Sequence, residues 1–478
     1  MRIHPADNVE VLLRPRGGVP AGHKVALRAI RAGEAVVKYG FPVGVATADV
    51  RKGEWVHTHN MRTALDGRSE YEYAPSPDEW KCDPGEFAGA TFDGFLRADG
   101  RAGVRNEIWI VPTVGCVNSV ASALAAENQG LVGGAVEGIY AFGHPYGCSQ
   151  TGEDHARTRR LLAALCRSPN AGGVLVLSLG CENLTQEQFR KELGEVDEAR
   201  VRFLVCQDVE DELAEGSALL AGIAEAMRGD RRETLPASKL VVGLKCGGSD
   251  GLSGITANPA VGRFSDILVS LGGSTVLTEV PEMFGAEPML LNRASSRDVF
   301  DRAARMVADF KAYFTSHGEP VYENPSPGNR AGGITTLEDK SCGCVQKGGS
   351  APVVDAIDYA GRVCRQGLNM MSGPGNDLVS ATALTAAGAQ IVLFTTGRGT
   401  PFGAPAPTVK ISTNTPLFER KRRWMDFNAG TVADGAETLD EAGGRLFRHV
   451  LRVASGERTM SERMGARGIA IFKGGVTL

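Results

Sequence analysis

The residues with the clearest capacity for chemistry lie in one polar segment, NPSPGNRAGGITTLEDKSCGC, at positions 324–344. It brings together the adjacent carboxylates Glu338 and Asp339, the amine of Lys340 and two thiols, the second at Cys344. Such groups bind metal ions and carboxylate substrates and transfer protons. The apolar residues of the segment are too few and too scattered for the buried face of a helix or strand. The pattern therefore favours a functional loop, with an ordinary surface loop as the alternative.

A histidine pair, His57 and His59, ends the first β-rich part of the chain, in the sequence EWVHTHNMRT. In an extended strand, side chains two positions apart project from the same face. Two neighbouring imidazoles can bind a divalent metal ion or a carboxylate. Exposed histidines on an edge strand are the alternative, but the place of the pair just before a change of composition favours a site.

A third histidine, His144, lies in the segment AFGHPYGCSQTGEDH at 141–155, where a strand is expected to pass into a helix. The nearby acids Glu153 and Asp154 are explained by the preference of carboxylates for a helix N-terminus. That explanation leaves His144, between a glycine and a proline, without a structural reason. We therefore predict that His144 transfers a proton.

The Gly-rich segment GLKCGGSDGLSGITANPAVG at 243–262 follows another expected strand. It lacks both the Gly-x-Gly-x-x-Gly fingerprint and the spacing of a P-loop lysine. Its glycines allow backbone N–H groups to approach a carboxylate, so Ser249 and Asp250 are predicted to bind substrate. Lys245 is either a base of altered pKa or a partner for a carboxylate. A lysine that extends to solvent is the alternative.

Five cysteines lie in Gly-rich loops of the chain: Cys116, Cys148, Cys181, Cys246 and Cys344. Single cysteines at strand ends can converge in space, and three of them suffice to hold an iron–sulfur cluster that leaves one iron open. None of the five has the compact spacing of ferredoxin cysteines. An iron–sulfur cluster is therefore the less favoured of the metal hypotheses.

The composition indicates an ordinary globular enzyme with more than one domain. The chain has 478 residues, of which 42% are hydrophobic and 23% charged, and this length is too great for a single core. Its formal net charge of -4 gives no reason to expect nucleic acid or an anionic membrane as a partner. No signal peptide or membrane span is recognisable. We expect a cytoplasmic protein with reduced cysteines.

The chain divides into a small all-β module and an α/β region. Residues 1–75 form the expected module, since short β-favouring runs alternate there with Gly- and Pro-containing turns. Residues 76–92 have no periodicity and are interpreted as a linker. The α/β region has two parts, 93–235 and 236–478, and the second is expected to end in a helical tail and a final strand, GIAIF at 468–472.

Near-continuous apolar runs in the α/β region are typical of strands buried on both faces. They are IWIVPTV at 108–114, VLVLSLG at 174–180, LVVGLK at 240–245 and IVLFTTG at 391–397. Helical patterns lie between them, which predicts mostly parallel sheets. Because ligands bind at the carboxyl ends of such strands, we expect the polar segment 324–344 to face these ends.

Long motifs in the chain resemble the sugar-acid dehydratase family that includes altronate dehydratase, galactarate dehydratase and sulfolactate sulfo-lyase. They are KYGFPVGVATADVRKGEWVHTHNMRT, GVRNEIWIVPTVGCVNSVA, GLKCGGSDGLSGITANPAVGRFSDI, TVLTEVPEMFGAEPM, YENPSPGNRAGGITTLEDKSCGCVQKGG and LFTTGRGTPFGAPAPTVKISTN. The resemblance runs end to end and includes the closing AIFKGGVTL. The family usually has a leucine where this chain has Cys342, which argues against Cys342 as an essential ligand.

The resemblance implies an N-terminal β-clip module of the antifreeze-like kind, joined to a two-part α/β catalytic region. It also implies dehydration of D-altronate to 2-dehydro-3-deoxy-D-gluconate in hexuronate breakdown, with dependence on iron(II) or manganese(II). Galactarate, another aldonate or aldarate, and sulfolactate are the alternative substrates on the same fold. A non-catalytic carbohydrate-binding module and an electron-transfer protein are hypotheses of other classes. The expected partner is a small sugar acid, with a homo-oligomer as an open alternative to a monomer.

The implied reaction suggests a role for each of the candidate residues. A proton next to a carboxylate is weakly acidic, so the base must act together with electrostatic stabilisation of the enediolate, which a divalent metal ion provides. The predicted metal ligands are His57, His59, Glu338 and Asp339. The predicted proton-transfer and carboxylate-holding residues are His144, Lys340 and Lys245. The predicted substrate-binding residues are Arg105, Asn106, Thr335, Thr336, Ser249 and Asp250.

Overall fold

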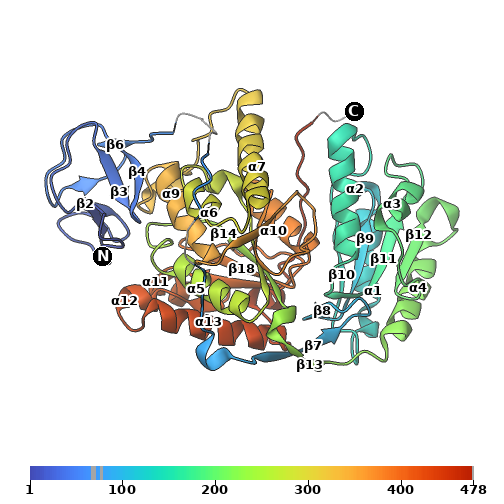
Figure 1. Cartoon of the computed structure of the whole chain (residues 1–478). Coiled ribbons are helices and arrows are strands. Elements are labelled where there is room, and N and C mark those ends of the chain that lie inside the picture. Colours follow the sequence, from blue (N-terminus) through green and yellow to red (C-terminus); the bar gives the residue numbers. More distant parts are fainter. Residues whose placement is uncertain (66–70, 76–78, 476–478) are drawn as a thin grey trace.

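The computed structural model describes residues 1–65, 71–75 and 79–475. Three parts lie side by side: a strand-rich N-terminal module, a large α/β domain and a smaller α/β domain (Figure 1). The large domain, built mainly from the second half of the chain, lies between the other two. Among the described residues, no helix is long and apolar enough to cross a membrane. The predicted fold class, a β module followed by an α/β region with parallel sheets, is confirmed.

The N-terminal module consists of two small antiparallel sheets, with strand orders β1-β2-β5 and β3-β4-β6. Their strands are β1 (Val9–Val11), β2 (Lys24–Ala26), β3 (Ala35–Lys38), β4 (Phe41–Ala46), β5 (Trp55–Val56) and β6 (Met61–Arg62). Short strands of valine and alanine, cut by glycine turns, form such sheets. Val9, Val36, Val43 and Val56 are buried, and they belong to the same apolar cluster as the core of the large domain.

The smaller α/β domain contains a four-stranded parallel sheet of order β10-β9-β11-β12. Its elements are β9 (Glu107–Pro112), α1 (Asn118–Glu127), β10 (Ile139–Ala141), α2 (Gly152–Cys166), β11 (Ala171–Ser178), α3 (Gln186–Leu193), β12 (Val201–Val205) and α4 (Glu212–Met227). Alternate residues of β9 pack on opposite faces, since Ile108 and Ile110 contact the layer of α1 and α4 while Trp109 and Val111 contact that of α2 and α3. The apolar run of β9 is therefore buried on both faces, as expected.

The large α/β domain contains a seven-stranded, fully parallel sheet of order β16-β17-β15-β14-β18-β19-β20. Its strands are β14 (Val241–Cys246), β15 (Ser274–Leu277), β16 (Val353–Ile357), β17 (Gly367–Met371), β18 (Ile391–Thr396), β19 (Thr408–Ser412) and β20 (Phe427–Asn428). α5 (Ala257–Ser270) and α13 (Leu439–Ala454) pack together on one face. α10 (Asp377–Ala386) covers the other face and contacts α2 of the smaller domain.

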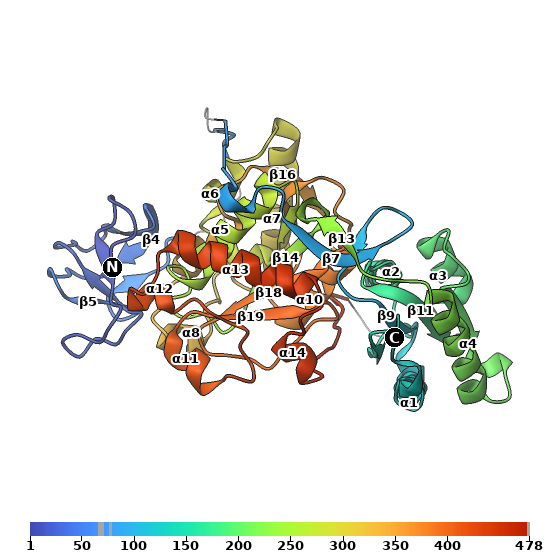
Figure 2. The same cartoon turned by 90° about the horizontal axis from the view of Figure 1, so that it is seen from below.

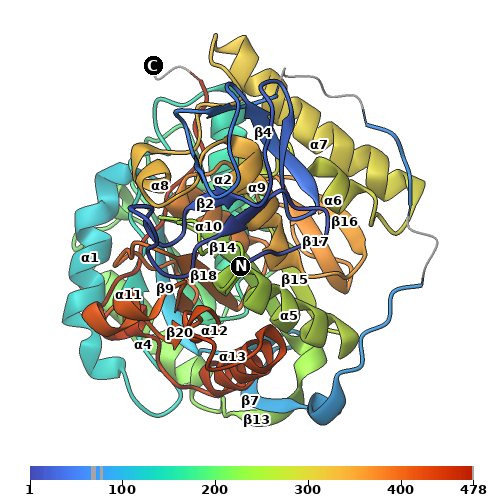
Figure 3. The same cartoon turned by 90° about the vertical axis from the view of Figure 1, so that its left-hand side faces the viewer.

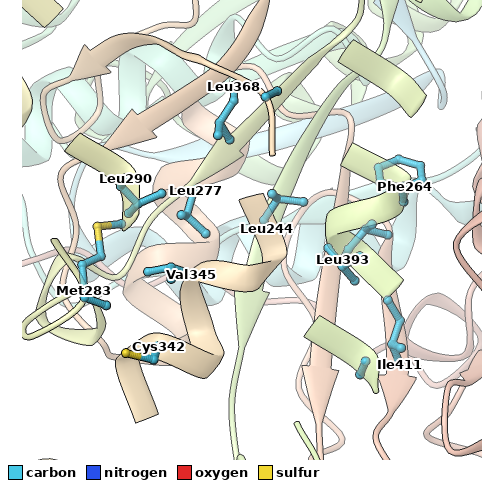
Figure 4. Packing of buried hydrophobic residues seen from close by; sticks show 14 of the residues in the cluster. Leu244, Phe264, Leu277, Met283, Leu290, Cys342, Val345, Leu368, Leu393 and Ile411 are labelled. Carbon is cyan, nitrogen blue, oxygen red and sulfur yellow. The ribbon is translucent and has the colours of Figure 1, made fainter. Parts of the chain in front are cut away.

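The core of the large domain connects the sheet to the helix that carries the polar segment. Leu244, Leu277 and Leu393 project from the strands toward one apolar layer (Figure 4). Cys342 and Val345 enter this layer from the chain around residue 344. Cys342 is therefore a core residue, and burial raises the pKa of its thiol to about 12.

A small antiparallel sheet joins the two α/β domains at the amino ends of their main strands (Figure 2). It pairs β7 (Thr91–Leu96) with β8 (Ala102–Gly103) and with β13 (Glu233–Pro236). β13 crosses the domain boundary that we placed at residue 235. β13, which follows the smaller domain in the chain, is thus paired with β7, which precedes that domain.

The polar segment 324–344 contains two short helices, so the interpretation of it as a loop without helix was wrong. α8 (Pro327–Ala331) begins with a capping box between Ser326 and Asn329, and α9 (Leu337–Cys344) begins at the N-cap Thr336. All residues of α9 are buried. A helix that is buried all round shows no amphipathic period, which explains why the pattern was missed. α8 and α9 lie behind the N-terminal module when it faces the viewer (Figure 3).

The remaining helices cover the edges of the large domain. They are α6 (Glu287–Leu291), α7 (Arg297–Ser316), α11 (Thr415–Arg420), α12 (Thr431–Asp434) and α14 (Met460–Arg463). The expected final strand at 468–472 is absent, because this segment is not paired with any described strand. Ile469 and Ile471 are nevertheless buried against the core between the two α/β domains. Their alternation reflects burial of one side of an extended segment.

Candidate active site

A buried cluster of ionisable side chains lies at the carboxyl ends of β14 and β15. Cys246 is the last residue of β14, and Glu279 and Glu282 come directly after β15. Cys344, the last residue of α9, completes the cluster from the polar segment. The expectation that this segment faces the strand ends is therefore confirmed.

Two thiols and one carboxylate form the centre of the cluster. Cys246 Sγ lies 3.5 Å from Cys344 Sγ, and Glu282 Oε2 lies 3.2 Å from each sulfur atom. Among the described residues, this is the one group of three His, Cys, Asp or Glu side chains whose donor atoms are close enough to share a metal ion. The second carboxylate, Glu279, accepts the Cys246 backbone N–H at 3.0 Å.

Three lysines surround this centre and are themselves buried. Lys340 Nζ lies 2.8 Å from Glu282 Oε1, and Lys347 Nζ lies 2.9 Å from Cys246 Sγ. Lys245 Nζ contacts Glu279 Oε1 and lies 2.9 Å from Asp377 Oδ1. A buried ammonium group is costly unless paired, so each lysine is held by a specific anionic partner.

Local chain geometry explains why these side chains converge. Glu279 has a left-handed backbone conformation, with φ of 71°, and it caps the short 3₁₀ helix Val280–Glu282. This turn directs both acids toward the sheet edge. Lys340 and Cys344 are four residues apart on α9, so they share one face of that helix.

The lysines decide which acids are ionised. Burial disfavours the charged form of Glu282, but Lys340, Lys245 and Lys347 outweigh it and hold its pKa well below the usual range. A hydrogen bond with Cys344 lowers the pKa of Cys246 to about 6, and that bond raises the pKa of Cys344 well above its ordinary value. Burial and the neighbouring Cys246 and Glu282 raise the pKa of Glu279.

The cluster places three ammonium groups close to its acids. Lys245, Lys340 and Lys347 are positive, since their anionic partners outweigh burial and raise each pKa. Close to them lie the ionised groups of Glu282 and Cys246, and the Asp377 carboxylate, whose Oδ1 is 2.9 Å from Lys245 Nζ. The arrangement can therefore neutralise a carboxylate, stabilise negative charge that develops beside it, and transfer a proton through Glu279.

The N-terminal module covers this site. Asp339 is paired with Lys24 of β2, at 2.7 Å, and with Lys38 of β3, at 3.1 Å. Glu338 Oε1 accepts hydrogen bonds from Thr63 Oγ1 at 2.9 Å and from the Ala64 N–H at 2.7 Å. A cavity of about 10 Å³ remains between module and cluster, which is too small for a six-carbon acid.

The four predicted metal ligands are not brought together. Glu338 and Asp339 bind the module, as just described. His57 Nε2 lies 3.0 Å from the carbonyl oxygen of Arg330. His59 is exposed beside the ring of Trp55. These side chains therefore belong to the contact between module and catalytic domain, or to the module surface.

His144 is placed in the smaller domain, where both ring nitrogens have backbone partners. Nε2 lies 2.8 Å from the Pro112 carbonyl oxygen, and Nδ1 accepts the Tyr146 N–H at 3.1 Å. Burial lowers the pKa of its imidazole. This arrangement corresponds to a neutral ring with the proton on Nε2. His144 therefore orders the loop after β10.

Arg105 and Asn106 lie at the amino end of β9, away from the carboxyl edge. The Arg105 guanidinium is bidentate with Glu462, at 2.7 and 2.9 Å, and it also donates to the carbonyls of Val104, Val453 and Glu457. Asn106 donates to Ala135 and Asp230 and accepts from Arg97. Their polar atoms are engaged by the protein itself.

The other predicted substrate-binding residues are close to the cluster, but they form hydrogen bonds with other parts of the protein. Asp250 accepts hydrogen bonds from Ser253, Thr413 and Asn414, which connects the loops after β14 and β19. Thr335 donates to Asp339, and Thr336 caps α9 and contacts the Val43 carbonyl. Ser249 is buried, and its carbonyl accepts from Asn329 Nδ2 at 2.8 Å.

The five cysteines proposed for a cluster separate into two groups. Cys246 and Cys344 are buried in the large domain. Cys116, Cys148 and Cys181 are exposed in the loops after β9, β10 and β11 of the smaller domain. A site that uses all five is therefore excluded.

Sequence reasoning missed Glu279, Glu282 and Lys347, which are central to the cluster. A signal for the two acids was present, because they follow the short β-favouring run STVL at 274–277. The rule that ligands bind at the carboxyl ends of parallel strands therefore applied to them. Lys347 had no such signal, since it comes from a short 3₁₀ turn after α9.

Models of known protein families match each of the three parts of this chain. The model described as "D-galactarate/Altronate dehydratase, C-terminal" matches residues 237–477. "D-galactarate dehydratase/Altronate hydrolase, second domain" matches residues 94–228. "Altronate/galactarate dehydratase SAF domain" matches residues 16–64. The three matches correspond to the large domain, the smaller domain and the N-terminal module.

Curated relatives are similar over their full length. Altronate dehydratase of Bacillus subtilis (strain 168) is 49% identical, with 100% of this chain and 99% of the relative aligned. Altronate dehydratase of Escherichia coli (strain K12) is 47% identical, with the same two coverages of 100% and 99%. Galactarate dehydratase (L-threo-forming) of Escherichia coli (strain K12) is 33% identical, with 99% and 96% aligned.

Proposed function

Because this chain belongs to the D-galactarate/altronate dehydratase family, we propose that it is a hydro-lyase that converts D-altronate to 2-dehydro-3-deoxy-D-gluconate. The altronate dehydratases are 47% and 49% identical to it, whereas the galactarate dehydratase is 33% identical. This difference favours altronate over galactarate. Galactarate is the second candidate substrate, on the strength of that full-length similarity.

The observation that carries the proposal is the convergence of three buried lysines and two buried carboxylates at the carboxyl ends of β14 and β15. Dehydration breaks the C2–H bond and the C3–O bond, and negative charge collects on the substrate carboxylate as C2 loses its proton. Ammonium groups fixed in a site shielded from water stabilise such charge without reorganisation. Lys245, Lys340 and Lys347 are suited to this task.

Glu279 is the proposed proton-transfer residue. Its pKa is raised by burial and by the neighbouring Cys246 and Glu282, and a carboxylate of raised pKa is a stronger base than an ordinary one. In this proposal it takes the proton from C2 and returns it to the departing C3 hydroxyl, which leaves as water. The resulting enol then gains a proton at C3 and loses its hydroxyl proton to give the 2-keto acid.

A metal ion implied by the family would be held by Cys246, Glu282 and Cys344. Two sulfur donors and one oxygen donor fit iron(II) better than manganese(II), which prefers oxygen ligands. When bound, such an ion supplies Lewis acidity toward a carboxylate or hydroxyl oxygen. Lys347 donates to Cys246 Sγ and so favours its thiolate form. The ten cysteines are all free, which fits our proposal of a cytoplasmic enzyme.

The test is a substrate screen with the purified full-length chain, in which formation of a 2-keto acid is measured. We expect D-altronate to be turned over with a kcat/KM at least roughly tenfold higher than that of galactarate. Sulfolactate and further aldonates serve as comparison substrates. Absence of keto acid from D-altronate, with turnover of another acid, would overturn the assignment.

A further inference from the structure

Three exposed thiols of the smaller domain lie on one edge of its sheet, outside the active site described above. Cys116 follows β9, Cys148 follows β10 and Cys181 follows β11, and all three are free and exposed. The carboxyl ends of parallel strands meet at the same edge of a sheet. The proposed dehydration uses none of these thiols.

The order of the strands makes this edge a natural ligand site. From β9 the chain passes to β10 on one side, and β11 then pairs with β9 on the other side. α1 and α3 consequently pack on opposite faces of the sheet. Such a topological switch point leaves a crevice outside the carboxyl ends of the strands, where α/β proteins bind ligands.

Each of the three cysteines follows a glycine that the packing requires. A Cβ atom at Gly115 would lie 2.8 Å from the His144 carbonyl oxygen, and one at Gly147 would lie 1.9 Å from the Thr113 carbonyl oxygen. A Cβ atom at Gly180 would lie 2.7 Å from Gln207 Oε1. Gly147 and Gly180 also have positive φ angles of 98° and 126°. The backbones of the first two loops thus approach one another too closely for a side chain at Gly115 or Gly147, whereas Gly180 is required by its positive φ and by the Gln207 side chain.

Hydrogen bonds connect the three cysteine loops. The Gly115 N–H donates to the Tyr146 carbonyl at 2.9 Å, which joins the first loop to the second. The Leu184 N–H donates to the Gly147 carbonyl at 3.0 Å, which joins the third loop to the second. Asn183 Oδ1 accepts from the Ser149 N–H at 2.9 Å and lies 3.5 Å from Cys148 Sγ.

Buried polar side chains brace these loops from beneath. Glu182 is 5% exposed and accepts hydrogen bonds from Thr113 Oγ1 at 2.7 Å and from the Gly180 N–H at 2.6 Å. His144 connects the end of β9 to the second loop, as described above. A buried carboxylate and imidazole are costly, and here they fix the backbone that carries exposed thiols.

We propose that Cys116, Cys148 and Cys181 hold an iron–sulfur cluster in which one iron has no protein ligand. Among the described residues, donor atoms are close enough to share a single ion at Cys246, Glu282 and Cys344 alone. The three exposed thiols are therefore too far apart for one shared ion, whereas a cluster binds each thiolate to a different iron. Each thiol loses its proton on ligation, and the remaining iron can bind a hydroxyl or carboxylate oxygen.

The fourth cysteine at this edge is excluded from the ligand set. Cys206 follows β12 but packs against the apolar layer of α1 and α4. Burial raises the pKa of its thiol to about 11, so the thiolate that a cluster requires is disfavoured. Cys206 and the exposed Cys364, which lies between β16 and β17, therefore serve as matched control positions.

The test is anaerobic reconstitution of the full-length chain with iron(III), sulfide and dithiothreitol, which reduces part of the iron, followed by measurement of bound iron, acid-labile sulfide and visible absorbance. We expect similar amounts of iron and sulfide in the wild type. Cys116→Ser, Cys148→Ser and Cys181→Ser should each reduce labile sulfide at least roughly tenfold. Cys206→Ser and Cys364→Ser should retain it, and circular dichroism of all variants separates ligand loss from misfolding.

Cys246→Ser and Cys344→Ser test whether the cluster is bound at the exposed edge of the smaller domain or at the buried site. Retention of labile sulfide in both variants supports the exposed site, and its loss in them overturns the proposal. Absence of labile sulfide in the reconstituted wild type, or its retention in the triple Cys116/Cys148/Cys181→Ser variant, also overturns it. The result is independent of the proposed dehydration, because it is measured without substrate.

Discussion

The sulfur atoms of Cys246 and Cys344 lie 3.5 Å apart although 98 positions separate them in the chain. One ends a central strand of the seven-stranded sheet, and the other ends a helix beneath the N-terminal module. Their contact fixes α9 against the carboxyl edge of the sheet. It also turns two isolated cysteines into one buried site, together with Glu282.

Replacement of Glu279 by glutamine should impair proton transfer, while Asp377 remains as a carboxylate partner of Lys245. We expect kcat to fall roughly 10²- to 10⁴-fold, with KM for D-altronate changed much less. Steady-state kinetics of Glu279→Gln measure both quantities. A variant with wild-type kcat would remove Glu279 from the reaction.

Replacement of Lys340 by methionine should leave Glu282 buried without its nearest ammonium group. The pair is nearly fully buried, with side-chain exposures of 8% and 6%, so the free energy of unfolding should fall by about 3–5 kcal/mol. Lys81→Met is the control, because its pair with Glu79 has exposures of 79% and 83%. Denaturant unfolding should show a change of no more than about 0.5 kcal/mol for this control.

Replacement of Asp339 by asparagine should weaken the seating of the N-terminal module. Lys24 and Lys38 would remain buried and would repel each other without the carboxylate between them, which should cost about 3 kcal/mol of stability. Glu34→Gln, which removes an exposed pair with Arg28 in the same module, is the control. Equal melting temperatures of the two variants would contradict this role of Asp339.

Protonation of His57 at acidic pH should weaken the contact between the N-terminal module and the catalytic domain. Burial lowers the pKa of His57 from 6.5 to about 4, so the unfolded chain binds this proton more readily between those values. The stability supplied by neutral His57 is complete above pH 6.5 and is lost as the pH falls toward 4. Melting temperatures should be measured from about pH 7.5 to about pH 4.5, a range that spans this window. Over this range they should fall less in His57→Gln than in the wild type. His317→Gln, on the exposed end of α7, should follow the wild type.

Sulfur ligation by the buried site can be detected without turnover. Cobalt(II) added anaerobically to the protein should produce thiolate-to-metal charge-transfer absorption if Cys246 and Cys344 bind it. Cys246→Ser should lose this absorption and Cys364→Ser should keep it. Absorption that persists when both Cys246 and Cys344 are replaced would show that the ion binds elsewhere.

Much of the architecture followed from the sequence because it is encoded locally. Apolar runs such as 108–114 and 391–397 are long enough to be buried on both faces of a sheet only as central parallel strands. Positions at the end of such strands lie at the ligand edge, which is why Lys245 and Cys246 were identified as candidates from the sequence. The same rule would have found Glu279 and Glu282. Cys344 was identified because it belongs to the polar segment 324–344.

The tertiary structure decided which polar residues face the site. Asp339 and Lys340 are neighbours in sequence, yet Asp339 is directed to the module and Lys340 to Glu282. Consecutive residues of a helix project about 100° apart, so the packing on each side of a buried helix assigns their roles. Arg105 was predicted to bind substrate, but it pairs with Glu462, a partner 357 positions away that the sequence could not reveal. A sequence records that a charge is present, and only the fold determines which opposite charge satisfies it.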